Sequence, residues 1–292
     1  MKFILISAVS FAILASCNGN NAEKKTNTII EDTTSVQLQD TTTVDNSPAV
    51  ESAESQSAIA FNTTDISEYD STQIQLASGV SFNVAVMKGY HINVAAEGLK
   101  RLRFLTLSPD KRLFVTDMYD KSDNHKGKVL VFEEWDEASK SFGKVSTYLD
   151  QLHNPNQVAF YNNYIYVAET DKLSRYTYQA GDVKPSSEKE VIASFPAYGL
   201  SYKYGGWHLT RSIAFHNDKL YVSVGSSCNA CIESEEVRAS VIEMDPDGKN
   251  AIEYARGLRN SVGMKWIGDE LWVTGMGRDL IGPDKPEDLF LK

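Results

Sequence analysis

The chain has 292 residues, of which 42% are hydrophobic, and its 39 acidic residues against 29 lysines and arginines give a formal net charge of -10. About -8 of this charge falls in residues 18–75, which hold ten acidic residues and two lysines. The rest of the chain is nearly neutral and lacks the excess of basic residues with which proteins bind the phosphates of nucleic acid. We therefore expect no nucleic-acid partner.

The N-terminus has the features of a lipoprotein signal peptide. Met1 and Lys2 precede an apolar run over residues 3–15, and Cys17 follows small residues at the end of this run. The run is too short to span a bilayer. A cysteine in this context is the acceptor for a diacylglycerol. We expect residues 1–16 to be removed, Cys17 to be lipidated, and the exported protein to be held by its lipid in the cell envelope, at the periplasmic side or at the outer membrane and cell surface.

Residues 17–75 are predicted to form a disordered stalk that begins with the lipidated cysteine. The segment is rich in Thr, Asn, Ser, Asp, Glu and Gln, and it has few large apolar residues. Such a segment buries too little surface to offset the loss of chain entropy on folding. The folded domain is therefore expected over residues 76–292.

Two cysteines remain in the predicted domain, Cys228 and Cys231, in the sequence Cys-Asn-Ala-Cys. A close pair in an exported protein favours a small disulfide loop. A zinc site would need two further Cys or His ligands in register. Free thiols and a redox-active pair are the alternatives, although no thioredoxin-like strand and helix surround the motif.

Four segments share one pattern, in which an apolar strand, a polar turn and an aromatic strand follow one another. The aromatic residue of the second strand recurs at intervals of 52, 55 and 51 residues. This period fits a four-stranded propeller blade with its loops. The prediction is an all-β fold, a β-propeller with about four blades, which is either a small ring or the first part of a larger one. The segments are residues 107–115, 160–167, 215–222 and 266–273, and their aromatic residues are Phe114, Tyr166, Tyr221 and Trp272.

A basic residue or a histidine occupies the same place before every repeat. Counting back seven residues from the start of each repeat gives Lys100, His153, His208 and Arg259. Equivalent positions of a propeller converge on its central channel, so these four side chains are expected to bind one anionic cofactor there. Two alternatives remain. Junctions between loop and strand are often simply polar and exposed, and the register leaves Arg101 in competition with Lys100.

Two of these positions have neighbours that favour ligand binding. His208 follows Gly205, Gly206 and Trp207, which offer a backbone that a ligand can approach closely and an aromatic wall. A neutral imidazole there can accept a proton from a hydroxyl. Arg259 follows Gly257, and a guanidinium beside a glycine turn suits a planar, anionic, oxygen-rich ligand.

Several motifs follow one another in a defined order in the second half of the chain. They are His208 with Ser212–Phe215, Leu220–Cys231, Arg238–Ser240, Tyr254–Asn260 and Gly277–Asp279. This series resembles the glucose/sorbosone dehydrogenase family, the soluble quinoprotein sugar dehydrogenases that carry pyrroloquinoline quinone (PQQ) on a six-bladed β-propeller. The likeness covers about residues 95–290.

The resemblance implies a role for each matching residue. His208 matches the general base that takes the proton of a sugar hydroxyl while a hydride passes to the quinone. Arg259 matches the arginine that stabilises negative charge on a quinone oxygen, and Asn260 matches the residue that supports the edge of the cofactor. The backbone carbonyls of Gly277 and Arg278 match ligands of a calcium ion, a hard cation suited to oxygen.

The chain departs from the family pattern at three places. Trp207 stands where the glucose-oxidising branch has an aspartate, so glucose itself is doubtful as substrate, and Val262 replaces a glutamine of that branch, as in the sorbosone type. The chain ends within the acidic motif, Glu287–Asp288, before the blades that supply a lysine and arginines to the cofactor carboxylates in the family. An incomplete propeller is therefore expected.

The sequence as a whole predicts an exported, lipid-anchored, PQQ-dependent dehydrogenase that also holds calcium. Its substrate would be a sugar, glucose-like or sorbosone-like, or another alcohol oxidised at a CH–OH group, and its electrons would pass to a separate acceptor. The alternatives are a non-catalytic propeller lipoprotein of binding type and an inactive, truncated homologue. A lactonase with a central calcium ion is disfavoured, because it needs several acidic or amide side chains on the axis and the recurring positions are cationic.

Overall fold

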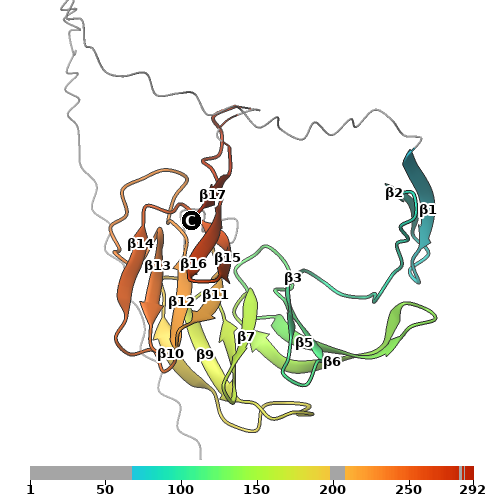
Figure 1. The fold of residues 1–292 in the computed structure, drawn as a ribbon, viewed down its shortest axis with the longest axis horizontal. Helices are drawn as coiled ribbons and strands as arrows, with labels where there is room; N and C mark the ends of the chain where they lie inside the picture. Colours follow the sequence, from blue (N-terminus) through green and yellow to red (C-terminus); the bar gives the residue numbers. More distant parts are fainter. Residues whose placement is uncertain (1–67, 198–207, 283–284, 286) are drawn as a thin grey trace, which may run out of the picture. The chain divides into compact units, whose positions relative to one another are not determined.

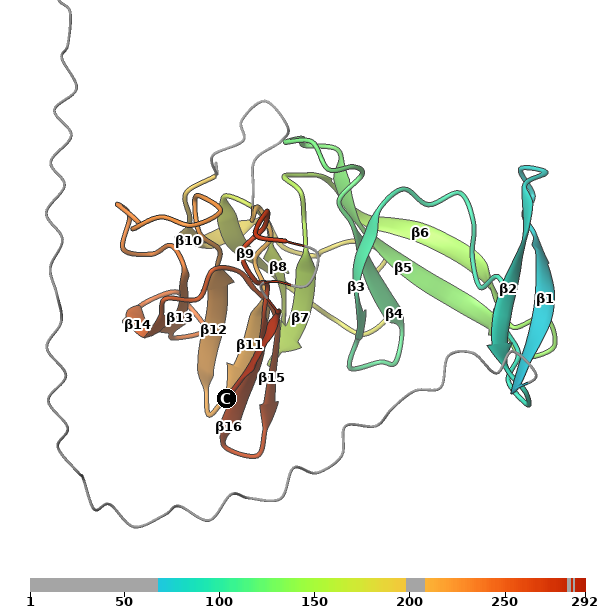
Figure 2. The same ribbon diagram turned by 90° about the horizontal axis from the view of Figure 1, so that it is seen from above.

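The computed structural model describes residues 68–197, 208–282, 285 and 287–292, and the regular elements in them are seventeen β-strands, shown in Figures 1 and 2. The predicted signal peptide, Cys17, the predicted stalk up to residue 67, and Gly205 to Trp207 lie outside the described residues. In the part of the chain that the structure describes, no helix has the length and apolar character required to cross a bilayer.

Regular structure begins earlier than we expected. Strand β1 (Tyr69–Gln75) pairs with strand β2 (Ser81–Met87) in an antiparallel hairpin. The last residues of the predicted stalk are therefore a strand and not a disordered segment. The side chain of Ile74 is buried, which composition averaged over the whole segment could not reveal.

The other strands form four antiparallel sheets in chain order, three of four strands and one of three. Within each sheet, strands that are consecutive in sequence are hydrogen-bonded neighbours. The first sheet contains β3 (Leu102–Leu107), β4 (Leu113–Asp117), β5 (Gly127–Asp136) and β6 (Ser141–Leu152); the second β7 (Gln157–Tyr161), β8 (Tyr164–Ala168), β9 (Lys172–Thr177) and β10 (Glu190–Ser194); the third β11 (Ile213–His216), β12 (Lys219–Val224), β13 (Ser240–Met244) and β14 (Ile252–Arg256); and the fourth β15 (Ser261–Ile267), β16 (Glu270–Gly275) and β17 (Leu289–Leu291).

Each predicted repeat is the hairpin of the first two strands of a sheet. The turns of these hairpins hold residues in the left-handed region of backbone space, such as Lys111 (φ 67°), Asn162 (φ 51°), Asp218 (φ 57°) and Gly268 (φ 61°). Glycine and short polar residues adopt this conformation most readily. The left-handed backbone conformation that these turns require therefore explains why polar residues and glycine occupy them.

The recurring aromatic residues hold neighbouring sheets together. Three of the four, Phe114, Tyr166 and Tyr221, each pack from the second strand of one sheet against an aromatic residue on the first strand of the next sheet, whereas Trp272 stacks on Phe290 of its own sheet. Such edge-to-face or tilted pairs contribute about 0.5–1.5 kcal/mol beyond the burial of their area. The pairs, with the distances between their ring centroids, are Phe114 and Phe160 at 5.0 Å, Tyr166 and Phe215 at 4.8 Å, and Tyr221 and Trp266 at 5.0 Å.

The first strands of the sheets are also neighbours in space. Strand β3 contacts β7, β7 contacts β11, and β11 contacts β15. Four-stranded antiparallel sheets that follow one another with their first strands side by side are the blades of a β-propeller. The predicted all-β propeller with about four blades is confirmed, and the segments that lead into the first strands carry the candidate site.

Candidate active site

His208 lies just before strand β11 and has an unusual backbone conformation. Its φ is 53°, in the left-handed region that few residues other than glycine adopt. Its carbonyl oxygen accepts a hydrogen bond of 2.8 Å from Nη1 of Arg211, a fully buried arginine. The same guanidinium donates to the carbonyl oxygens of Thr210 at 3.1 Å and Pro196 at 2.8 Å. Arg211 therefore fixes the backbone that presents the histidine.

The imidazole of His208 has a defined tautomer. Its Nδ1 lies 2.9 Å from the carbonyl oxygen of Ser226 and 3.0 Å from the hydroxyl oxygen of the same residue. That hydroxyl donates its own hydrogen to the carbonyl oxygen of Cys228 at 2.7 Å. Both oxygens of Ser226 can then only accept from Nδ1, so Nδ1 carries the hydrogen. Nε2 is the basic nitrogen of the ring.

The surroundings keep this imidazole neutral. Burial lowers the pKa of His208 below its ordinary value, and the positive charge of Arg259 lowers it further, against the hydrogen bond to Ser226, which raises it. At neutral pH the ring is therefore uncharged, as a general base must be.

The opposite side of the histidine packs against a glycine. A Cβ atom placed on Gly225, the residue directly after β12, would overlap Cβ of His208 and lie 2.8 Å from Oδ1 of Asn260. Asn260 is buried, and its Nδ2 lies 3.2 Å from the sulfur of Met276. The missing side chain at Gly225 therefore lets the histidine and the asparagine approach each other.

His208 and Asn260 line a cavity of about 410 Å³ together with Arg103 of β3, Arg101 just before this strand, and Lys121 of the loop between β4 and β5. No carboxylate is among the described residues that line it. Nε of Arg103 donates to Oδ1 of Asn156 at 3.1 Å, which ties this arginine to the second sheet. Three cations beside a neutral histidine make the cavity suited to a ligand that carries several anionic oxygens.

Arg259 lies next to this cavity, in a second one of about 570 Å³. Its carbonyl oxygen accepts a 2.7 Å hydrogen bond from the amide of Ser226, the residue that also holds His208. Its guanidinium donates to Asn229 and to Asp279. Nη1 of Arg259 is buried and has no hydrogen-bond partner among the described residues. An arginine nitrogen in this condition is a ready donor for an anionic group of a ligand.

The segment predicted to bind calcium borders the same cavity. Gly277 and Arg278 line it, and the amide of Gly277 donates to Oδ1 of Asp288 at 2.8 Å. Neither of the two carbonyl oxygens accepts a hydrogen bond from the residues that the structure describes. Carbonyl oxygens left available in this way are suitable ligands for a hard cation.

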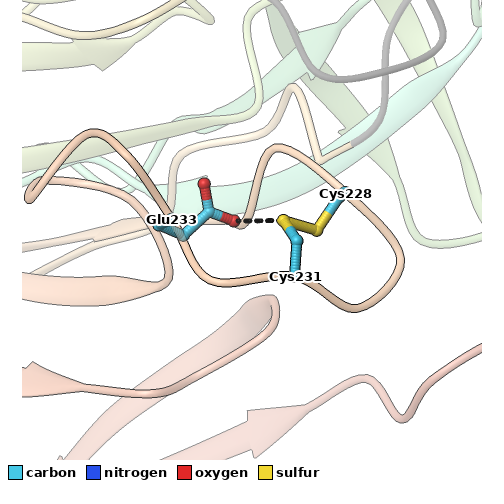
Figure 3. A group of neighbouring side chains, drawn as sticks. All are labelled: Cys228, Cys231 and Glu233. Atoms are coloured by element: carbon cyan, nitrogen blue, oxygen red, sulfur yellow. Dashed lines mark hydrogen bonds between the residues drawn. A yellow bond between two sulfur atoms is a disulfide. The ribbon is translucent and has the colours of Figure 1, made fainter.

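Cys228 and Cys231 form the predicted disulfide (Figure 3). With Glu233 they are the one group of three Cys, His or acidic residues in the described chain whose potential ligand atoms lie close together. The sulfur of Cys231 is 3.6 Å from Oε1 of Glu233. Because the two sulfurs are bonded to each other, neither is a thiolate, and we assign no metal to this group.

The structure does not bring all four recurring positions to one cavity. Lys100 lines a separate cavity of about 420 Å³ beside β5, with Lys126 and Lys128. His208 and Arg259 are linked through Ser226. Arg101, the alternative to Lys100 in the sequence register, lines the cavity of His208.

His153 is buried in an ion-pair network of its own. Nδ1 of its imidazole lies 3.2 Å from Asp171, and Nε2 contacts Asp123. Its amide donates to the buried carboxylate of Glu169 at 2.8 Å. Burial alone would lower the pKa of His153, but the bonds to Asp171 and Asp123 outweigh it and raise the pKa. The position holds the first two sheets together and does not line the cavity of His208.

Sequence reasoning missed several residues of the site and named Arg101 only as an alternative to Lys100. Arg103 was missed, although it stands two residues after Arg101 and so projects from the same side of an extended strand, which could have marked the two as a pair. Ser226 and Asn229 belong to the Leu220–Cys231 motif, but the contacts by which they hold His208, Arg259 and Asp279 span 18 to 50 positions of the sequence. No local pattern indicates such contacts.

The fold and the site together define a β-propeller that carries a cation-lined cavity with a neutral histidine at its edge. The family model described as TrAA12-like matches residues 84–284. The chain belongs to this family, in agreement with the resemblance to glucose/sorbosone dehydrogenases. No curated protein matches the sequence.

Several solved structures share the fold. A calcium structure of the carbohydrate-active enzyme family AA12 from Trichoderma reesei aligns with a TM-score of 0.53 and 16% identity, over 67% of this chain and 52% of that one. The holo form of the PQQ domain of pyranose dehydrogenase from Coprinopsis cinerea aligns with a TM-score of 0.51 and 15% identity, over 67% of this chain and 49% of that one. The chain thus spans about half the length of these structures.

Proposed function

We propose that the protein is a quinoprotein dehydrogenase that oxidises a CH–OH group of a sugar or another alcohol. The observation that carries the proposal is the pairing of His208 and Arg259 through Ser226, which sets a neutral base next to a fixed positive charge. Membership of the TrAA12-like family supports it. The holo PQQ domain of pyranose dehydrogenase supports the choice of cofactor.

The residues present fit PQQ, which has three carboxylates and an ortho-quinone. Arg101, Arg103 and Lys121 supply positive charge along the cavity of His208. The unpartnered Nη1 of Arg259 supplies a further donor. We propose that these residues and Asn260 hold the cofactor. Lys100 and His153, which we expected among the contacts, are left out of this set because neither lines the cavity.

Bound PQQ would supply the acceptor for a hydride. In our proposal His208 uses Nε2 to take the proton of the substrate hydroxyl, with Ser226 accepting from Nδ1 so that the ring keeps its orientation. Arg259 would stabilise the negative charge that a quinone oxygen of the acceptor gains with the hydride. Because Asn229 and Asp279 fix its guanidinium, the positive charge needs no rearrangement during the reaction.

We propose that the carbonyl oxygens of Gly277 and Arg278 hold calcium. Calcium is bound by carbonyl and carboxylate oxygens in flexible geometry. Glu287, which lines the same cavity, has such a carboxylate. The calcium structure of the AA12 enzyme supports this choice of ion.

Export and anchoring at Cys17 complete the proposal. The apolar run before Cys17 and the small residues beside it support lipidation. An envelope location would place the domain with sugars and alcohols outside the cytoplasm, and its electrons would pass to an acceptor there.

The proposal is tested by reconstitution of the full chain with PQQ and CaCl₂. Reduction of a dye by a panel of aldoses and simple alcohols is followed, and omission of PQQ serves as the control. Turnover that needs both additions supports the proposal. Saturable binding of PQQ without turnover on any alcohol would favour the non-catalytic binding propeller, and no binding of PQQ would overturn the cofactor assignment.

A further inference from the structure

Asn229 lies between the two half-cystines and contacts two separate parts of the candidate site. Its backbone carbonyl accepts from Nε of Arg259 at 2.8 Å, and its Oδ1 accepts from Nη2 of the same guanidinium at 3.0 Å. The same Oδ1 accepts from the amide of Asp279 at 2.8 Å, and Nδ2 donates to the carbonyl oxygen of Asp279 at 2.9 Å. One side chain thus joins the arginine to the segment after Gly277 and Arg278.

The N–H donors of the Arg259 guanidinium fall into two sets, one bonded to Asn229 and Asp279 and one without an acceptor among the described residues. A guanidinium has one hydrogen on Nε and two on each terminal nitrogen. The hydrogen on Nε goes to Asn229, and the two on Nη2 go to Asn229 and to Asp279, the latter at 2.6 Å. The two hydrogens on Nη1 have no acceptor among the described residues. Asn229 and Asp279 therefore hold one edge of the guanidinium and leave the other edge available.

The disulfide fixes the position of Asn229. It closes a ring of four residues with 6.0 Å between the Cα atoms of Cys228 and Cys231. Cys228 is buried, and its carbonyl oxygen accepts from the hydroxyl of Ser226 at 2.7 Å. The ring is thereby attached to the residue that orients His208. A short covalent ring leaves its inner residues few alternative conformations.

We propose that Asn229 is a positioning residue that holds Arg259 and the Gly277–Asp279 segment in one fixed arrangement, and that the Cys228–Cys231 disulfide keeps Asn229 in place. This inference rests on the proposed function, because its purpose is to preset the cofactor and calcium contacts. Residues that orient ligating groups in this way usually change affinity or activity by about 10–100-fold when they are replaced.

The test uses the full chain and the variants Asn229→Ala, Asn229→Asp and, as the matched control, the exposed strand residue Asn83→Ala. Two quantities are measured: hydrogen exchange of the Asp279 amide without any ligand, and the dissociation constant for PQQ in CaCl₂. Asn229→Ala should speed exchange at Asp279 and weaken PQQ binding by about 10–100-fold. Asn229→Asp keeps the oxygen acceptor and should recover most of the lost affinity. Asn83→Ala should match the wild type in both.

The two measurements separate this inference from the proposed function. Wild-type exchange at Asp279 in Asn229→Ala would overturn the inference, whether or not PQQ binds. A wild type that binds no PQQ would overturn the proposed function, while faster exchange in the alanine variant would still support the contact made by Asn229. Reduction of the disulfide should also speed exchange at Asp279, and unchanged exchange would overturn the part assigned to Cys228 and Cys231.

Discussion

The carbonyl oxygen of Ser226 lies 2.9 Å from Nδ1 of His208. The amide of Ser226 also donates to the carbonyl oxygen of Arg259 at 2.7 Å. A single peptide segment thus sets both the tautomer of the proposed base and the backbone of the proposed electrostatic stabiliser. Because the two functions share one support, a displacement of this segment would disturb both together.

His208 should control the acid limb of the pH profile. Burial, and then the charge of Arg259, lower the pKa of His208, so the base is neutral above its ordinary value of about 6.5 and becomes protonated only at a lower pH. We expect kcat/KM of the reconstituted enzyme to be independent of pH near 7 and to fall in the acid range. His208→Ala should lower kcat by about 10²–10⁴-fold.

The contribution of Arg259 to this pKa can be measured without turnover. Removal of the positive charge in Arg259→Gln should raise the pKa of the His208 imidazole, followed by NMR in the absence of PQQ. A lower or unchanged pKa in this variant would contradict the electrostatic link between the two residues.

Gly225→Ala should damage the site through a steric conflict. The added methyl group would overlap Cβ of His208 and crowd Oδ1 of Asn260. Overpacking of this kind costs about 1–3 kcal/mol, and the displaced base should lower kcat as well. The free energy of unfolding and kcat are measured together, with Gly282→Ala as the control because no atom lies within 4 Å of a Cβ placed there.

Arg211→Met should reduce activity although Arg211 lines neither of the two cavities of the site. Burial lowers the pKa of Arg211 to about 9, so the residue remains charged at neutral pH and donates to three carbonyl oxygens. A buried acceptor left without its donor costs about 1–3 kcal/mol. We expect a lower free energy of unfolding and a lower kcat, because the φ of 53° at His208 loses its support.

The matched control for this prediction is Arg256→Met, since Arg256 is an exposed arginine at the end of β14. It should leave kcat and stability close to wild type. Wild-type kcat in Arg211→Met would show that the carbonyl contact does not position the base.

His153 should make stability depend on pH in the neutral to alkaline range. Burial alone would lower the pKa of His153, but Asp171 and Asp123 raise it above its ordinary value. A raised histidine pKa contributes stability that is complete below about 6.5 and is lost as pH rises through the folded-state pKa. The difference in unfolding free energy between wild type and His153→Gln should therefore shrink as pH rises from 6 to 9.

Asp171→Asn provides the check on this mechanism. The pKa of Asp171 lies below its ordinary value, so its own ionisation does not change between pH 6 and 9. Loss of its charge should remove much of the pH dependence in that window. A pH dependence equal to that of wild type would assign the effect to other groups.

The sequence predicted the architecture well because the propeller hairpins are local. A polar turn between two apolar strands needs only a few consecutive residues, and the aromatic residue of the second strand marks the contact with the next sheet. Phe114 and Tyr166 are almost fully buried for this reason. The predicted start of the folded domain, residue 76, was too late, because β1 (Tyr69–Gln75) is a hairpin strand of mixed composition that precedes it.

The candidate site was predictable only in part. His208 and Asn260 line one cavity, as the proposed roles require, but a fixed count of seven residues does not place Lys100 and His153 there. His208 precedes β11 by five residues, whereas Lys100 precedes β3 by two, so equal spacing in the sequence does not give equal places in space. Contacts such as that of Asn229 with Asp279 depend on tertiary structure and have no signature along the chain.

The aromatic pairs between sheets limit which parts of the sequence can be replaced independently of one another. The second and third sheets each contribute side chains to a core on both of their sides, so neither can be replaced alone without disturbing the packing of its neighbours. The loops that carry Ser226, Asn229 and Asp279 contribute no ring to these pairs, but they hold His208 and Arg259 in place, so they too tolerate few changes.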